Sequence, residues 1–184
     1  SWSPRIPEVA AALDVGDAAL GIALLGFAAG AIPAMLCAGH LTRWVSPELV
    51  SLLSATAFSL GLPVIAAAPN LVALFAALFG MGVAGGLCDI TMNLTGVRIE
   101  HRLRSGVLGR LHAGFSLGVV AGGVGALVAT SLGASVAGHF AVVAAVLVVL
   151  AATAAPGLLR AGGRGPERER VPETGRPPDG PRFT

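Results

Sequence analysis

The chain has 184 residues, of which 54% are hydrophobic and only 12% are charged, and its mean hydropathy is +0.80. Soluble domains carry about twice this fraction of charged residues, so the composition argues against a soluble globular protein. The formal net charge of +2 is small, which makes the positions of the charges more informative than their sum.

The segment 1–17 places a single arginine, Arg5, among three acids, Glu8, Asp14 and Asp17. It has none of the features of a signal peptide. We expect the residues before Pro7 to be the last turn of a first membrane helix, truncated upstream. Arg5 has two alternative roles: it stays inside a helix bundle and attracts an anion, or it extends to lipid headgroups.

Five apolar runs follow, and each has about the twenty helical residues needed to cross the hydrocarbon core of a bilayer. A backbone surrounded by lipid must satisfy its own hydrogen bonds, and runs of this length and pattern do not fit a β-barrel. The predicted fold class is therefore all-α, a polytopic transmembrane helix bundle over residues 1–156. The predicted spans are Ala18–Ala38, Leu49–Ala68, Leu71–Leu94, Ala113–Leu132 and Ala134–Ala155.

Arginine is concentrated in alternate connectors. His40–Glu48, Thr95–His112 and Pro156–Thr184 together hold eleven of the chain's twelve arginines, whereas Pro69–Asn70 and the connector around Gly133 carry no charge. Because basic loops stay on the cytoplasmic side, we expect these three connectors in the cytoplasm of a bacterial inner-membrane protein. With the truncated helix included, the unit would have six spans and both ends inside.

The tail 157–184 is rich in proline and mixed charge and has almost no apolar residues, which predicts a disordered cytoplasmic segment. Two interpretations remain open. The tail is a linker to a second six-helix half, or it is a terminal tail or frame-shifted end.

Ionisable groups inside a span are costly and are functional candidates by default. Asp89 is the only acid inside an apolar run, and Asn93 and Glu100 share its helix face by their spacing. We interpret this face as a polar stripe along a solute path, with Asp89 as a partner for protons or solute. Alternatively, Asp89 anchors an interhelical hydrogen bond, and Glu100 simply pairs with a neighbouring arginine.

His112 begins the next span, and Ser116 lies one turn further along the same face. His112 could pair with Glu100 or Asp89 and titrate near neutral pH, or it could be an interfacial histidine at a helix end. His139 and His40 also lie at span ends and are interpreted as interfacial.

The sequence contains no nucleophile–base pair, phosphate-binding loop or nucleic-acid surface, so it predicts no enzyme and no bound cofactor. Cys37 and Cys88 lie in apolar runs and are interpreted as small buried hydrophobic residues, not as metal ligands or a disulfide. The pairs Gly26/Gly30, Gly82/Gly86 and Gly118/Gly122 are expected to allow close helix contacts.

Several motifs resemble a bacterial branch of the major facilitator superfamily, the fucose-permease-like and sugar-type permeases. The run Trp2–Pro7 resembles the end of the family's first helix, and Ala19–Gly21 resembles the start of its second. The most specific likeness joins Asp89–Glu100, an acid-x3-Asn-x2-Gly-x3-Glu helix, to His112–Gly118, a His-x2-Phe-Ser-x-Gly helix. The resemblance covers about residues 2–155.

The resemblance implies a twelve-helix transporter of which this chain is the first half, with the C-terminal six-helix half missing and coupling commonly to protons. The family's loop between helices two and three usually reads Gly-x-Leu-x-Asp-Arg-x-Gly-Arg. Here Gly39 and Leu41 match, but the acid and the second glycine are absent, which weakens a latch through that loop. Glu100, Arg43 and Arg102 remain the candidates for a cytoplasmic gate.

Two functions follow from these observations. The first is a proton-coupled secondary transporter of a small polar solute, with Asp89, Asn93, His112, Ser116 and Arg5 along the path of solute or protons. The second is a non-transporting membrane module, such as a truncated half-transporter or a helix-bundle scaffold. Both place the chain in a lipid bilayer, and neither identifies the solute.

Overall fold

The structure, a computed structural model, describes residues 2–163 and consists of helices joined by short turns. A 3-10 helix, η1 (Ser3–Arg5), leads into the short helix α1 (Ile6–Leu13). Five long helices follow: α2 (Asp17–Leu41), α3 (Pro47–Ala66), α4 (Leu71–Leu103), α5 (Val107–Ser131) and α6 (Val136–Gly163). The all-α class predicted from the sequence is confirmed.

Each of the five long helices is long and apolar enough to cross a membrane. The five apolar runs identified in the sequence coincide with these helices. Where a helix begins later or ends earlier than its apolar run, the difference is at most two residues. At their other ends several helices continue into polar sequence, since a helix does not have to stop where the hydrocarbon does.

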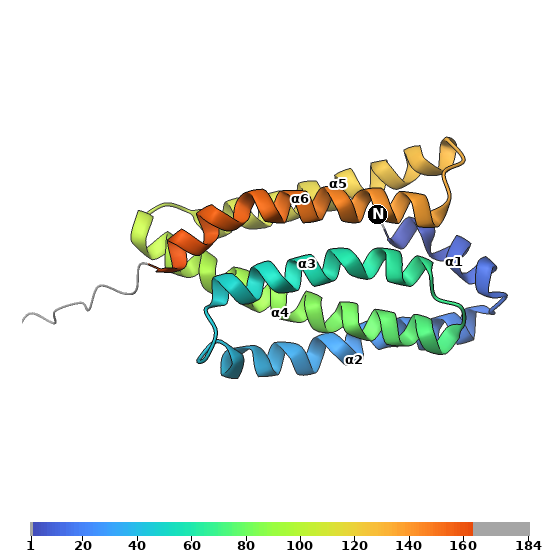
Figure 1. Ribbon diagram of the computed structural model, residues 1–184, viewed down its shortest axis with the longest axis horizontal. Coiled ribbons are helices and arrows are strands. Elements are labelled where there is room, and N and C mark those ends of the chain that lie inside the picture. Colours follow the sequence, from blue (N-terminus) through green and yellow to red (C-terminus); the bar gives the residue numbers. More distant parts are fainter. Residues whose placement is uncertain (1, 164–184) are drawn as a thin grey trace, which may run out of the picture.

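The helices run back and forth, so that the connectors fall alternately at the two ends of the bundle (Figure 1). Turns 42–46 and 104–106 and the end of α6 lie at one end, which we call the arginine-rich end. The segment from η1 to α1, the α3–α4 turn and the α5–α6 turn lie at the opposite end (Figure 1).

Two sequence expectations about connectors need correction. The segment Thr95–His112 is mostly helical, because α4 continues to Leu103 and α5 begins at Val107. Arginine, glutamate and leucine favour helix once a helix has been nucleated, and α4 ends where Arg104 adopts a left-handed backbone conformation with φ 48°. Similarly, α6 passes through Pro156 to Gly163, so residues 157–163 are helical. The rest of the predicted disordered tail lies outside the described residues.

The segment before α2 also differs from the expected end of a membrane helix followed by a loop. Pro7 lies in the first turn of α1 instead of terminating a helix, a position where proline's fixed φ and missing N–H cost nothing. The eight residues of α1 end at Leu13, and Asp14 caps the helix in a left-handed conformation.

Helices α2 and α4 make the most intimate contact in the bundle, through glycines on both. A Cβ atom added to Gly26 would lie 2.7 Å from the carbonyl oxygen of Phe75, and one added to Gly86 would lie 2.6 Å from that of Ala31. At Gly82 the added Cβ would overlap the Phe27 carbonyl outright. The backbones therefore touch directly, as small residues permit in membrane bundles.

The largest buried apolar cluster lies toward the end of the bundle opposite the arginine-rich end. It unites residues of α1, α2, α3, α4 and α6, among them Val9, Leu20, Leu62, Leu74 and Phe140. Trp2 packs against this cluster with its ring centroid 6.2 Å from that of Phe140. The cluster thereby attaches the first helices of the chain to the last one.

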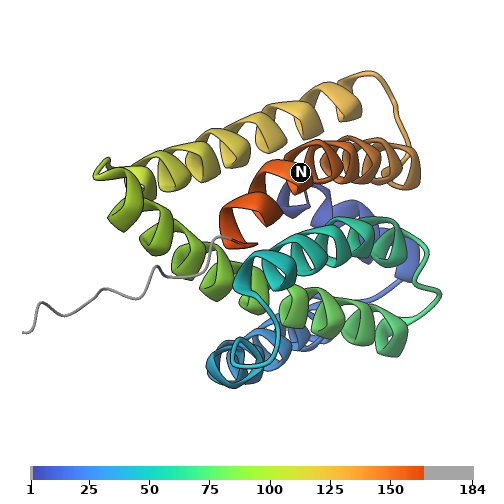
Figure 2. The ribbon, with the colours of Figure 1, turned by 60° about the vertical axis from the view of Figure 1, so that its left-hand side comes forward.

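Helix α5 is far less covered than α2, α3 and α4, and Ala126 is its one buried residue among those described. Figure 2 shows α5 diverging from the group formed by α2, α3 and α4. Gly118, which was expected to contact another helix, has nothing within 4 Å of an added Cβ. Most of the apolar surface of α5 is therefore available to lipid or to protein outside the described residues.

The α2–α4 contact generates a prediction. We expect Gly82→Ala to lower the stability of the detergent-solubilised chain by about 1–3 kcal/mol, because the methyl group forces two backbones apart. Gly80→Ala is the matched control on the same helix, since nothing lies within 4 Å of its added Cβ. Thermal unfolding followed by loss of the monodisperse peak in size-exclusion chromatography measures both. Equal midpoints for the two variants would contradict the proposed contact.

Candidate functional site

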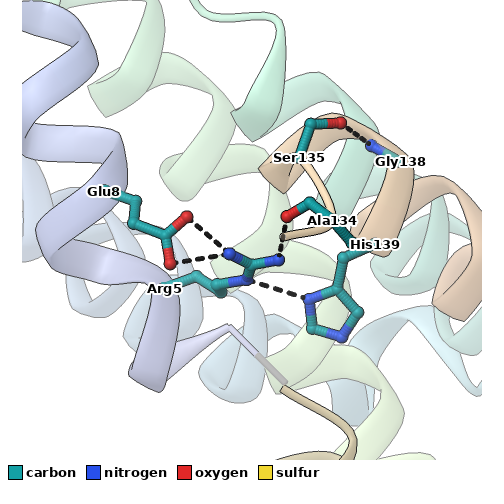
Figure 3. A network of polar contacts seen from close by, with 6 residues as sticks. All are labelled: Arg5, Glu8, Ala134, Ser135, Gly138 and His139. Atoms are coloured by element: carbon teal, nitrogen blue, oxygen red, sulfur yellow. Dashed lines mark hydrogen bonds and ion pairs between the residues drawn. The ribbon is translucent and has the colours of Figure 1, made fainter. Parts of the chain in front are cut away.

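The most extensively connected polar group in the described residues is Arg5. Its side chain is only 1% exposed although it lies at an end of the bundle. We call the group formed by Arg5, Glu8, Ala134 and His139 the Arg5 clamp (Figure 3). Of the two roles left open for Arg5, extension to lipid headgroups is wrong, because the guanidinium points into the protein.

Each nitrogen of the Arg5 guanidinium donates a hydrogen bond to a different partner. Nη1 donates to both carboxylate oxygens of Glu8, one of them at 2.6 Å, and Nη2 donates to the carbonyl oxygen of Ala134 at 2.7 Å. Nε lies 3.4 Å from Nδ1 of His139. One planar cation thus joins η1, α1, the α5–α6 turn and α6, a use for which the fork-shaped guanidinium is well suited.

The backbone conformation of the α5–α6 turn directs the carbonyl group of Ala134 toward Arg5. Gly133 adopts φ 68°, a left-handed conformation that glycine accepts without strain. Ser135 then begins α6 by accepting a hydrogen bond from the N–H of Gly138 through its hydroxyl, at 3.1 Å (Figure 3). The Ala134 carbonyl lies between these two features and faces the guanidinium.

The electrostatics of the clamp favour an ionised Glu8. Hydrogen bonding from the Arg5 guanidinium lowers the pKa of the Glu8 carboxyl below its ordinary value of 4.5. The Glu8 side chain is 40% exposed, so water screens much of this attraction. The buried part of the clamp is the contact of Arg5 with His139, which is 7% exposed and has an Nε2 atom with no hydrogen-bond partner among the described residues.

The polar stripe predicted on α4 is present in part. Asn93 donates to the backbone carbonyl of Asp89 at 2.8 Å and lies 3.4 Å from one of its carboxylate oxygens. Asp89 is exposed on the surface of the described bundle, while Gly86 and Thr91 beside it are buried. Among the described residues, no hydrogen bond joins the Asp89 side chain to another helix.

Glu100 has a structural partner that the sequence did not indicate. Its Oε2 accepts the backbone N–H of Leu108 at 2.9 Å and thereby caps the first turn of α5. A carboxylate is well placed there, since the free N–H groups of a helix start attract negative charge. Glu100 also lines a cavity of about 580 Å³ at the arginine-rich end, together with Val97, His101, Arg104 and Leu108.

His112 and Ser116 lie together on α5, in its second and third turns. The Ser116 hydroxyl donates to the backbone carbonyl of His112 at 3.0 Å, and both side chains are exposed. Among the described residues, no hydrogen bond or ion pair joins His112 to Asp89 or Glu100. The predicted pairing of His112 with either acid is thus not formed within this chain.

Sequence reasoning missed one buried acid, Glu48, at the start of α3. It is 4% exposed, and its Oε1 lies 3.8 Å from Nη1 of Arg98 on α4. This ion pair links α3 to α4 at the arginine-rich end, where the predicted gating residues Arg43 and Arg102 are both exposed. The position of Glu48 directly after Pro47 in the first turn of a helix was the available signal for a fixed carboxylate.

The helices, their length and their surface define a multi-pass α-helical membrane protein. The sequence profile described as Major Facilitator Superfamily matches residues 3–182, and the chain belongs to this superfamily of transporters. The resemblance noted from its motifs is thereby confirmed at the level of the superfamily.

The curated relatives agree with this assignment. The chain is 32% identical over its whole length to an uncharacterized MFS-type transporter of Yersinia pestis, of which it covers 44%. It is 34% identical over 66% of its length to the membrane protein MosC of Rhizobium meliloti, covering 30% of that protein. It is 29% identical over 78% of its length to an uncharacterized transporter of Sinorhizobium fredii, covering 38%.

The chain thus spans less than half the length of each of these relatives. No solved structure matches it.

The Arg5 clamp leads to a prediction that distinguishes the geometry of the Arg5 side chain from its positive charge. We expect Arg5→Lys to destabilise the chain by about 1–3 kcal/mol, because one ammonium cannot serve Glu8, Ala134 and His139 together. Arg43→Lys, at an exposed arginine in the α2–α3 turn, is the matched control and should leave the unfolding midpoint unchanged. Unfolding of Arg5→Lys at the same temperature as the parent chain would contradict a structural role for the clamp.

Proposed function

We propose that the chain is the N-terminal half of a secondary active transporter that moves a small polar solute together with protons across the bacterial inner membrane. In this proposal a second six-helix half completes the transporter, and the two halves rock against each other around a central path. The length of the relatives supports a longer whole, since the Yersinia pestis protein is more than twice as long as the aligned segment.

The observation that carries the proposal is the exposure of Asp89 on an otherwise apolar bundle. It lies in the middle part of α4, a helix suited to cross the membrane. A carboxylate at that depth does not face lipid, because leaving it unsolvated in hydrocarbon costs several kcal/mol, by rough estimate. The surface of α4 that bears Asp89 therefore faces a hydrated path or another part of the complete transporter.

Other polar groups extend this surface. Asn93 is one turn further along α4 and contacts Asp89 directly. His112 and Ser116 add polar groups to α5. We assign Asp89 as the proton-binding group, with Asn93, His112 and Ser116 as solute contacts. We assign Glu100 to hold α4 and α5 together near a cytoplasmic gate to which Arg43 and Arg102 contribute charge.

Uptake by the complete protein tests the role of Asp89. Proteoliposomes containing a pH-sensitive dye are exposed to a panel of monosaccharides, polyols and amino acids, and proton entry is recorded with each solute. We expect Asp89→Asn to reduce solute-dependent proton entry to the level of empty liposomes, because the amide binds no proton. The control is Asp14→Asn, since asparagine also accepts the left-handed conformation found there.

Normal proton entry with Asp89→Asn would remove Asp89 from the mechanism. If the parent protein admits no protons with any solute but still accumulates one of them, coupling to protons is wrong while transport stands.

Labelling of single cysteines tests the proposed orientation. In a background with Cys37→Ala and Cys88→Ala, cysteine is placed at Arg43, Arg102 or Asp17, and intact cells are treated with a membrane-impermeant maleimide. Because arginine-rich turns stay in the cytoplasm, we expect Asp17→Cys alone to react until the membrane is permeabilised. Labelling of Arg43→Cys and Arg102→Cys from opposite sides would overturn the topology.

A further inference from the structure

His139 in the Arg5 clamp has a hydrogen-bonding state that its contacts determine. Arg5 Nε carries a hydrogen and can only donate, so Nδ1 of His139, 3.4 Å away, must accept through its lone pair. The imidazole is therefore neutral, with its hydrogen on Nε2. That Nε2–H is buried and finds no acceptor among the described residues.

A proton taken up from the medium would add to the only free lone pair of this ring, on Nδ1. The bond to Arg5 would then be replaced by two N–H groups that face each other, each on a positively charged side chain. At 3.4 Å the existing hydrogen bond is already long, so the protonated ring would lose this bond and become a second buried cation beside Arg5. Protonation of His139 and its hydrogen bond from Arg5 are thus mutually exclusive.

We propose that His139 is a proton-binding site whose occupation releases the segment Ser3–Leu13 from the α5–α6 turn. This site is separate from the Asp89 surface of the proposed function, and it lies at the end of the bundle opposite the arginine-rich end (Figures 1 and 3). The ligand of this site is the proton itself. The expected response is a conformational change in which η1 and α1 detach from α5 and α6.

The charges that face His139 come from few elements. Within the described residues these are the positive Arg5 of η1 and, on the far side of its guanidinium, the negative Glu8 of α1. Helices α3 and α5 pack nearby, but their charged residues, Glu48 and Arg110, lie at the arginine-rich end. The ring of Phe140 covers another side, with its centroid 5.6 Å from that of the imidazole.

Glu8 does not produce the same response at the same pH. Arg5 holds the pKa of Glu8 below its ordinary value of 4.5, so Glu8 keeps its charge throughout the range in which an imidazole takes up a proton. Release at a pH where Glu8 is still ionised would therefore report on a histidine, and release only where carboxylates take up protons would report on Glu8.

Trp2 provides the readout, because its ring packs against Phe140, the residue after His139. The chain has two tryptophans, and Trp44→Phe removes the other one, which is 81% exposed. Quenching of Trp2 fluorescence by acrylamide is measured in detergent across pH values from about 8 to about 5, the range in which histidine titrates. We expect the quenching constant to rise at least about twofold as the pH falls, since the Trp2 ring loses its cover.

Two complementary variants identify the residue that causes the pH-dependent rise in the quenching constant. His139→Gln offers an oxygen that accepts from Arg5 but does not titrate, so its quenching constant should stay low at every pH. The triple variant His40→Gln, His101→Gln, His112→Gln leaves His139 as the sole histidine and should retain the full rise. Far-UV circular dichroism and elution volume check that each variant is folded, and His139→Asn replaces His139→Gln if that variant fails.

A quenching constant that does not change with pH in the Trp44→Phe parent overturns the proposal without reference to any variant. So does an equal rise in His139→Gln, because another group must then control the clamp. Neither result bears on solute uptake through Asp89, which is measured separately.

Discussion

The structure depends on the direct backbone contact between α2 and α4. Gly26, Gly82 and Gly86 leave no room for a side chain at this contact, so neither helix could shift along the other without a clash. In lipid there is little hydrophobic gain from bringing apolar helices together, and close van der Waals contact takes its place. With α2 and α4 fixed, α3 packs against α4, and the cluster around Leu62, Leu74 and Phe140 positions α6.

Much of this arrangement was predictable, because hydropathy and arginine placement are strong signals in membrane proteins. The five long helices, the alternation of connectors and the glycine contacts of α2 and α4 were all expected. The helix ends were not, since polar helix formers such as Arg98 and Glu100 extend α4 into the connector. Hydropathy indicates where a span leaves the hydrocarbon, but it does not indicate where the helical hydrogen bonding stops.

The polar sites were less predictable from the sequence than the helices. Sequence reasoning identified Arg5, Asp89, Asn93 and Glu100 as residues of interest, because charge in an apolar context is conspicuous. It did not identify the partners of Arg5 and Glu100. The bond from Arg5 to His139 spans 134 positions. The donor to the Glu100 carboxylate is the backbone N–H of Leu108, which no side-chain pattern encodes. The glycine pair predicted on α5 lacked a contact at Gly118, since small residues permit an approach without enforcing one.

Helix α5 touches the rest of the described bundle chiefly near its two ends. At its start, Leu108 and Leu111 fit against Gly96, where an added Cβ would lie 2.8 Å from the Leu111 side chain. Beyond its end, the Ala134 carbonyl is held by Arg5. Because most residues between these two ends are exposed, a sideways shift of the middle of α5 would break few contacts with the other described helices.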